Sequence, residues 1–264
     1  MPKLTGFVLA LALYTAGHTF GEEPKREPTT ASKVPDLTPE DRKATDVLLE
    51  RLIALIATVD ASQDKRANAC TMLSKFGPSG KSGVPAVLGF IDSQLAEQAG
   101  MQRYYYYNDN TRRNTMQVMY PTGTKDRLIQ AVETLGRMGS DAKAALPVLI
   151  KLSGTVVQEA TKGPGEEDPK PDIKKQPPMS LQATAAVALG RVGGEEALAA
   201  LTKLLNTDKL SDTRLGAVEG MIVLATSTDK TVNLPAQAQL RVIAEVDEDK
   251  AVRYAAAQAL EPKK

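Results

Sequence analysis

The chain repeats one short pattern of small and apolar residues five times, and this repeat constrains its fold more than any other feature. In each copy an alanine stands four residues before a leucine or methionine: Ala69 with Leu73, Ala131 with Leu135, Ala185 with Leu189, Ala217 with Met221 and Ala256 with Leu260. A small apolar residue follows each alanine, and glycine follows the pattern at Gly77, Gly139 and Gly193. Steps of three and four residues place the apolar side chains on one helix face, and a glycine after the last turn is typical of a helix end. Copies at irregular intervals indicate a repeat protein.

A second column joins an aspartate to an arginine six residues later. It occurs in three copies, as Asp60 with Arg66, Asp208 with Arg214 and Asp247 with Arg253. Each arginine lies three residues before the alanine of its copy, so the three pairs share one register. A bidentate contact between arginine and carboxylate would fix the angle and register of neighbouring helices, so we interpret these residues as structural.

With these two columns the sequence resembles the HEAT-repeat family, in its short bacterial variety related to phycobilin-lyase repeats. The resemblance covers roughly residues 38–261. It implies helical hairpins with an aspartate in the turn and an arginine early in the second helix, and these side chains form a ladder between neighbouring repeats. Two copies depart from the pattern, because they hold Thr122 with Leu128 and Gln176 with Gln182 at the ladder positions.

The resemblance implies an all-α fold, a right-handed α–α superhelix (solenoid) of about five helical hairpins. The sequence places the hairpins approximately at 38–76, 83–139, 142–193, 195–225 and 233–261. Thr38 with Pro39 is a helix-start signal, and the Val-Pro and Leu-Pro pairs at Pro85, Pro147 and Pro235 predict a proline at the first position of three further helices.

The N-terminal segment reads as an export signal. Lys3 precedes the apolar run 4–16, and small residues follow at a cleavage site that we place after Gly21. The run is too short to cross a membrane, and the sequence predicts no membrane span in the mature chain. We therefore expect a signal peptide at 1–21, a disordered linker at 22–37, and a periplasmic or extracellular protein. An uncleaved anchor is the alternative.

Two insertions, at 99–125 and 159–179, interrupt the predicted hairpin turns. Such turns lie along one edge of a solenoid, and insertions gathered on one face often mark a binding face. The first insertion is rich in tyrosine and arginine, which are enriched at protein interfaces. The predicted partner-binding residues are Arg103, Tyr104, Tyr105, Tyr106, Tyr107, Arg112, Arg113 and Tyr120. The alternatives are that the tyrosines fold back over the solenoid edge or that the loop is simply low-complexity.

No catalytic constellation is evident from the sequence. After cleavage the chain lacks histidine, which excludes a Ser–His–Asp triad and deprives zinc of its usual ligands. Cys70 falls in a buried column. We interpret the basic column Lys75, Arg137 and Arg191 as a solvated face, and the alternative is a basic line along the repeat array. The mature chain carries equal numbers of acidic and basic residues, so no nucleic-acid partner is predicted. We expect no metal and no cofactor.

The sequence therefore predicts an exported, non-enzymatic HEAT-repeat scaffold that binds a protein or peptide. Two alternatives stay open. One is an enzyme, or an enzyme accessory, of the phycobilin-lyase-like type, and the other is a purely structural spacer. The oligomeric state does not follow from the residues.

Overall fold

The computed structural model describes residues 38–96, 123–154, 179–208 and 210–261, together with the backbone of 104–107 and 114–117. The chain divides between Arg42 and Lys43 into two units, and the repeats lie in the second, residues 43–264. Of the first unit, residues 38–42 are described, and they hold the start of the first helix. The predicted signal peptide and linker lie outside the described residues and stay predictions.

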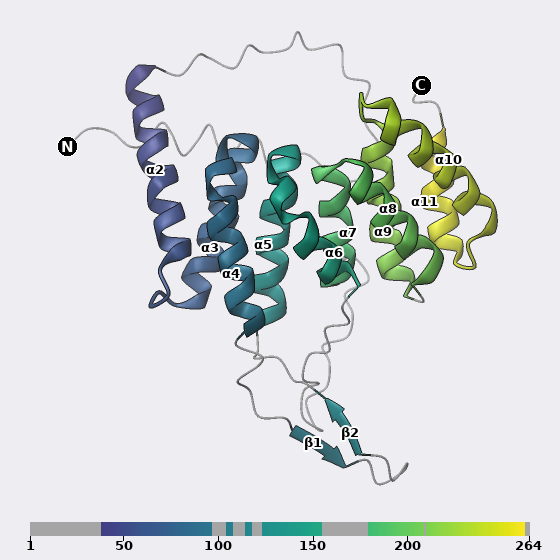
Figure 1. Cartoon of the computed structure of the whole chain (residues 1–264), viewed down its shortest axis with the longest axis horizontal. Helices are drawn as coiled ribbons and strands as arrows, with labels where there is room; N and C mark the ends of the chain where they lie inside the picture. Colours follow the sequence, from purple (N-terminus) through teal and green to yellow (C-terminus); the bar gives the residue numbers. More distant parts are fainter. Residues whose placement is uncertain are drawn as a thin grey trace, which may run out of the picture. The chain divides into compact units, whose positions relative to one another are not determined.

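The described repeats consist of paired α-helices (Figure 1). The first helices of the pairs are α2 (Pro39–Ala57), α4 (Val84–Ala96), α6 (Leu146–Ser153), α8 (Glu195–Thr207) and α10 (Lys230–Val246). The second helices are α3 (Gln63–Leu73), α5 (Thr124–Met138), α7 (Leu181–Val192), α9 (Ser211–Ala225) and α11 (Lys250–Leu260). Two 3-10 segments, η1 (Ser74–Gly83) and η2 (Gly139–Ala145), connect α3 to α4 and α5 to α6. The all-α solenoid of about five hairpins is confirmed.

The second helices stack in chain order. α5 packs against α3 and α7, and α9 packs against α7 and α11. Each hairpin therefore buries its apolar face against its neighbours, as expected of a repeat array. Among the described helices, none is long and apolar enough to traverse a lipid bilayer.

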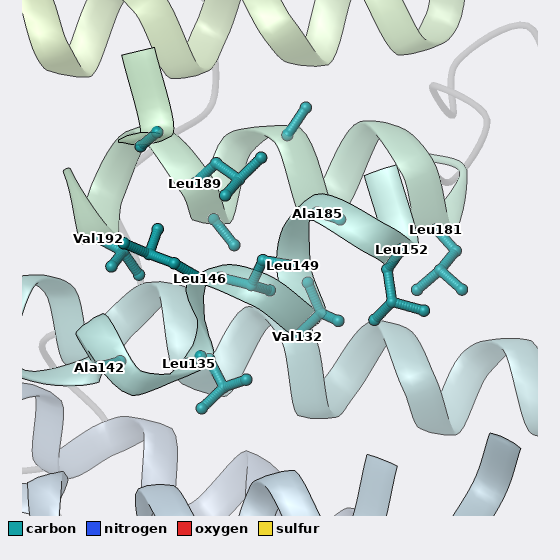
Figure 2. Close-up of a cluster of buried hydrophobic side chains, with 14 of the residues drawn as sticks. Val132, Leu135, Ala142, Leu146, Leu149, Leu152, Leu181, Ala185, Leu189 and Val192 are labelled. Carbon is teal, nitrogen blue, oxygen red and sulfur yellow. The ribbon is translucent and has the colours of Figure 1, made fainter. Parts of the chain in front are cut away.

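The core consists of the alanine and leucine columns that define the sequence repeat. Figure 2 shows its central part, where Leu149 of α6 lies among side chains of α5 and α7, including Val132, Leu135 and Leu189. All four of these side chains are fully buried. The columns recur in register because each second helix presents the same face to the same kind of neighbour.

Helix ends follow the residues that the sequence marks. Ser62 and Ser180 cap α3 and α7 by accepting hydrogen bonds from backbone N–H groups three residues later. Gly139 and Gly193, directly after α5 and α7, have φ angles of 64° and 79°, which glycine adopts without steric cost. A Cβ atom at Gly139 would lie 3.7 Å from the carbonyl oxygen of Arg191, so this turn also brings neighbouring helix ends together.

The contact between α7 and α9 is unusually close because glycines lie at the crossing. A Cβ atom at Gly190 would lie 2.3 Å from the carbonyl oxygen of Gly220 and 2.4 Å from its Cα atom. A Cβ atom at Gly216 would lie 2.5 Å from the carbonyl oxygen of Ala183. Any larger side chain at these positions would overlap backbone atoms, so the spacing of these two helices depends on glycine.

Two features of the structure differ from the sequence predictions. Helix α10 begins at Lys230, so Pro235 lies inside the helix instead of at its first position. The Asp229 side chain accepts a hydrogen bond from the Thr231 N–H, and the Asn233 side chain donates to the Ala225 carbonyl, which together hold the earlier start. The first insertion also contains two short antiparallel strands, β1 (Tyr104–Tyr107) and β2 (Asn114–Gln117), which pair Tyr104 with Gln117.

Candidate interaction surface

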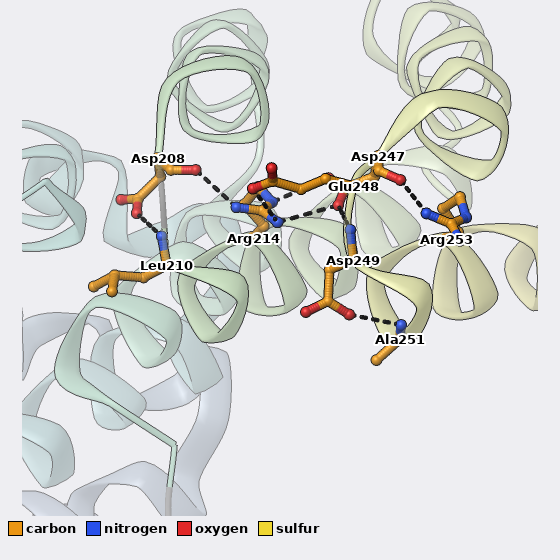
Figure 3. Close-up of polar contacts among 8 residues, drawn as sticks. All are labelled: Asp208, Leu210, Arg214, Asp247, Glu248, Asp249, Ala251 and Arg253. Carbon is orange, nitrogen blue, oxygen red and sulfur yellow. Dashed lines mark hydrogen bonds and ion pairs between the residues drawn. The ribbon is translucent and has the colours of Figure 1, made fainter.

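Arg214 connects two neighbouring hairpins (Figure 3). Its Nε atom donates to Asp247 Oδ2 at 3.0 Å and its Nη2 atom to Asp247 Oδ1 at 3.2 Å. Its Nη1 atom donates to the backbone carbonyl of Asp208, at 3.0 Å. The side chains of Arg214 and Asp247 are only 5% and 4% exposed, so this is a buried bidentate ion pair between repeats.

The pair belongs to a longer chain of contacts. Arg253 donates to the backbone carbonyl of Asp247, as Arg214 does to that of Asp208. The Asp247 Oδ1 atom also accepts from the Asp249 N–H at 2.8 Å, which shapes the turn before α11. In both copies the arginine therefore bonds the carbonyl of its own aspartate, while the Arg214 guanidinium also takes the carboxylate of the next copy.

The first copy uses different contacts. Arg66 donates to the Ile56 carbonyl at 2.8 Å and to Ser93 Oγ at 3.3 Å, and its guanidinium lies 4.8 Å from the centre of the Phe90 ring. The Asp60 side chain lies on the exposed surface. The predicted Asp60–Arg66 ladder position therefore holds a buried arginine that joins α2, α3 and α4.

Sequence reasoning missed the contact that the second copy makes. Leu128, at the arginine position, is fully buried. The preceding residue, Arg127, donates from Nε to the Gly123 carbonyl at 3.0 Å and lies 3.7 Å from Asp64 Oδ1 of the neighbouring α3. An arginine one residue earlier therefore contacts the neighbouring repeat here, but through an exposed carboxylate instead of a buried one. In the third copy Gln182 is buried at the arginine position.

Charged side chains form two rows across the exposed face of the second helices. The basic column is defined by Lys75, Arg137 and Arg191, all of which are exposed. Arg137 and Arg191 lie in the last turns of α5 and α7, and Lys75 lies in η1, two residues after the end of α3. An acidic column of exposed residues lies at the opposite ends: Asp64, Asp126 and Asp212. Acidic side chains near helix N-termini and basic side chains near C-termini interact favourably with the helix dipole, so both columns stabilise the helices.

The pKa of the Glu219 carboxyl group is affected by one residue of each column. Glu219 lies on α9, and partial burial raises the pKa of its carboxyl group above the ordinary value. The Arg191 guanidinium lowers this pKa and the Asp212 carboxylate raises it further. A partner that contacts this face therefore meets positive charge near one edge and negative charge near the other.

A groove lies between the C-terminal ends of α6 and α8. Its volume is about 570 Å³, and its lining is mostly apolar with Lys203 and Asp208 at the margin. The remaining lining residues are Ile150, Ser153, Gly154, Ala200, Leu204, Thr207 and Leu210. The described chain stops at Gly154 on one side of this groove, next to the second insertion.

The predicted partner-binding residues lie where the structure describes little. Arg103, Arg112, Arg113 and Tyr120 lie outside the described residues, and for Tyr104 to Tyr107 only the backbone of β1 is described. Of the second insertion, 159–179, only residue 179 lies among them. The role of this tyrosine-rich insertion in partner binding stays a prediction.

Cys70 is fully buried, and burial raises the pKa of its thiol to about 12. We expect the folded chain at pH 8 to react with a disulfide reagent such as DTNB far more slowly than the unfolded chain, because the thiolate population falls roughly a thousandfold when the pKa rises by three units. Because the folded pKa is the higher one, this burial stabilises the fold below about pH 9, and the stabilisation declines as the pH rises toward 12. Labelling that is equally fast in buffer and in urea would contradict the burial.

The described part of the chain contains no cluster of three or more histidine, cysteine, aspartate or glutamate side chains that could hold a metal ion. Its stacked helices are joined by buried arginine contacts, and their exposed surface carries both acidic and basic side chains. The chemistry that such a surface supports is the binding and positioning of another macromolecule.

Comparison with known proteins identifies one repeat directly. Residues 181–207, which comprise the whole of α7 and α8, match the family model of the PBS lyase HEAT-like repeat. The predicted HEAT-like repeats are thereby confirmed. Among solved structures the chain is similar to the complex of CpcE and CpcF of phycocyanin lyase from Nostoc sp. PCC7120, with 20% identity over 82% of this chain and 99% of that chain and a TM-score of 0.45. Curated protein sequences yield no match.

The prediction that the chain is not an enzyme is wrong, because the repeat that it matches is that of a lyase. The prediction rested on the absence of histidine and of a reactive cysteine. That absence bears on nucleophilic and zinc-dependent sites, whereas a repeat surface contributes to a transfer reaction by holding the reactants in place, which is itself a large part of catalysis.

Proposed function

We propose that this protein works in a lyase-type enzyme related to the phycobilin lyases, where the exposed face of its second helices binds the protein that is acted on. The observation that carries the proposal is the PBS lyase HEAT-like repeat at 181–207. That repeat contains α7 and therefore Arg191, the last charge of the basic column.

The geometry of the face supports a protein partner. Lys75 lies two residues after the end of α3, and Arg137 and Arg191 lie on α5 and α7, the next two second helices; packed helices are spaced by about 8–10 Å. A basic row of that kind suits a partner with several carboxylates, because complementary charges raise the association rate and set the orientation. The buried Arg214–Asp247 pair joins α9 to the turn before α11, beyond the last helix of the row.

The activity is tested by mixing the purified chain with a linear tetrapyrrole and an apo-phycobiliprotein subunit as acceptor. We expect absorbance in the visible range that stays with the acceptor after denaturation, which shows a covalent bond. The experiment needs any second subunit of the enzyme to be added in a separate arm. If neither arm yields bound chromophore, the lyase assignment is wrong.

The role of the basic column is tested by a triple variant, Lys75→Glu, Arg137→Glu and Arg191→Glu. We expect binding of the acceptor, measured by biolayer interferometry, to weaken roughly tenfold or more, because like charges then face each other. The matched control is Lys43→Glu, Arg51→Glu and Lys230→Glu, which makes the same change in net charge at exposed positions of α2 and α10. If both triple variants lose the same affinity for the acceptor, the effect depends on net charge alone, and the acceptor does not bind specifically at the basic column.

A further inference from the structure

Helix α11 exposes a face that every other second helix buries. The residue after the repeated alanine is fully buried in α3, α5, α7 and α9, where it is Cys70, Val132, Ala186 and Val218. In α11, the last helix that the structure describes, the same position is Ala257, and it is exposed. The column of small residues thus ends on an uncovered surface.

Contacts between the earlier helices show what this face does. A Cβ atom at Gly136 of α5 would lie 3.1 Å from the Cα and Cβ atoms of Ala188 on α7, and the Ala186 carbonyl of α7 would lie 2.6 Å from a Cβ atom at Gly220 on α9. In each case the face turned toward the next repeat carries small residues that allow close helix contact. By register, α11 turns Tyr254 and Ala257 in that direction.

The large side chain next to Ala257 on this face is Tyr254, one helical turn earlier. Tyr254 is 65% exposed, and its hydroxyl accepts a hydrogen bond from Gln258 Nε2 at 2.7 Å, which orients the ring along the helix. An exposed aromatic ring beside an exposed alanine offers one large and one small surface for association.

We propose that this face pairs with the same face of a second copy of this chain, with the two α11 helices antiparallel around a two-fold axis. Such an isologous contact requires a self-complementary surface. An axis that passes opposite the midpoint between residues 255 and 256 sets Tyr254 of one copy against Ala257 of the other, a large side chain over a small one. The same axis sets Lys250 against Glu261, so opposite charges meet.

The four residues occupy one side of the helix. At 3.6 residues per turn, positions 250, 254, 257 and 261 fall within an arc of about 60°, away from Val252 and Ala256, which are buried against the rest of the chain. Lys250 and Glu261 are both exposed at the two ends of α11. The size match and the charge match therefore arise from a single placement of the axis, and this agreement favours a second copy over an unrelated partner.

The dimer is tested on the full chain by sedimentation equilibrium over a range of concentrations. As the concentration increases, we expect the mass to rise from that of the monomer to twice that value. A contact between one helix of each copy is small, so we expect a dissociation constant of about 1–100 µM. Ala257→Glu places a charge in the centre of the contact and should leave a monomer. A mass that stays at the monomer throughout, or that grows beyond the dimer as head-to-tail stacking would give, overturns the proposal.

The register is tested by charge reversal. Lys250→Glu alone and Glu261→Lys alone should each weaken the dimer severalfold, whereas the two changes in one chain should restore it, because the pair is then swapped in both copies. Ala251→Glu, at an exposed position about a quarter turn away, is the control and should leave the mass unchanged. A dimer that Ala257→Glu does not disturb, or a double variant as weak as the singles, contradicts the antiparallel α11 contact. Circular dichroism of each variant verifies that the helices stay folded.

Discussion

Replacing Gly190 with alanine lowers the melting temperature of the chain by roughly 6–12 °C, which corresponds to about 3 kcal/mol for a protein of this size. The added Cβ atom would lie 2.3 Å from the carbonyl oxygen of Gly220 and 2.6 Å from its carbonyl carbon. These are backbone atoms in the middle of α9, so they cannot rotate away as a flexible side chain would. Helices α7 and α9 must move apart, and the contacts that bury Ala186 and Ala217 loosen with them.

At another position of the chain, replacing glycine with alanine is expected to raise the free energy of unfolding instead of lowering it. Gly89 lies on the exposed side of α4, and no atom lies within 4 Å of a Cβ atom placed there. Gly89→Ala should stabilise the chain by about 0.5–1 kcal/mol, because alanine favours the helix. Thermal melting by circular dichroism measures both variants. Equal melting temperatures for Gly190→Ala and the unmodified chain would show that the close crossing of α7 and α9 is not required.

Replacing Arg214 with methionine destabilises the chain by about 3–5 kcal/mol. Methionine keeps most of the apolar volume of the side chain but removes the guanidinium, and the Asp247 carboxylate, 4% exposed, then loses both of its bonds to Arg214. The Asp208 carbonyl loses a donor as well. A buried charge without its partner is the main cost, because the carboxylate was removed from water to make this contact.

Two further variants separate the buried pair from ordinary surface charge. Arg214→Met together with Asp247→Leu should recover part of the loss, because no unpaired charge then stays buried. Asp64→Asn removes the partner of Arg127, but the Asp64 side chain is 84% exposed, so we expect a change below about 0.5 kcal/mol. Urea denaturation followed by circular dichroism compares the variants. If Arg214→Met and Asp64→Asn have similar effects, Arg214 does not hold the repeats together.

The Asp–Arg contacts between repeats show which interactions could be predicted from the sequence and which could not. The spacing of the Asp–Arg pairs carried the resemblance to HEAT repeats, which implied contacts between neighbouring repeats, and the structure brings Arg214 and Asp247 together. The spacing could not reveal Arg127, because it stands one residue before the arginine position and its partner Asp64 lies in another hairpin. A side chain with a long stem can reach the same neighbour from adjacent positions, so a column in the sequence is not a column of contacts.

The enzymatic assignment marks a limit of reasoning from residue types. The missing histidine and the buried Cys70 correctly describe what the repeats lack, yet they led to the wrong conclusion about activity. Binding and positioning leave no compact motif, because they use exposed side chains from several repeats, as we propose for Lys75, Arg137 and Arg191. Only the packing order of α3, α5 and α7 makes these residues neighbours.

The sequence by itself determined the helical hairpins, their number and most of their ends, because helix periodicity, capping residues and glycine stops act within a few neighbouring residues. It also determined which face of each second helix is buried, since the alanine and leucine columns repeat in every copy. The tertiary structure alone decided how closely the helices approach at Gly190 and Gly220, which carboxylate Arg214 binds, and that Ala257 is exposed while its counterparts are buried. These properties depend on atoms that are distant in the chain and on where the stack of described helices ends, and no local pattern encodes them.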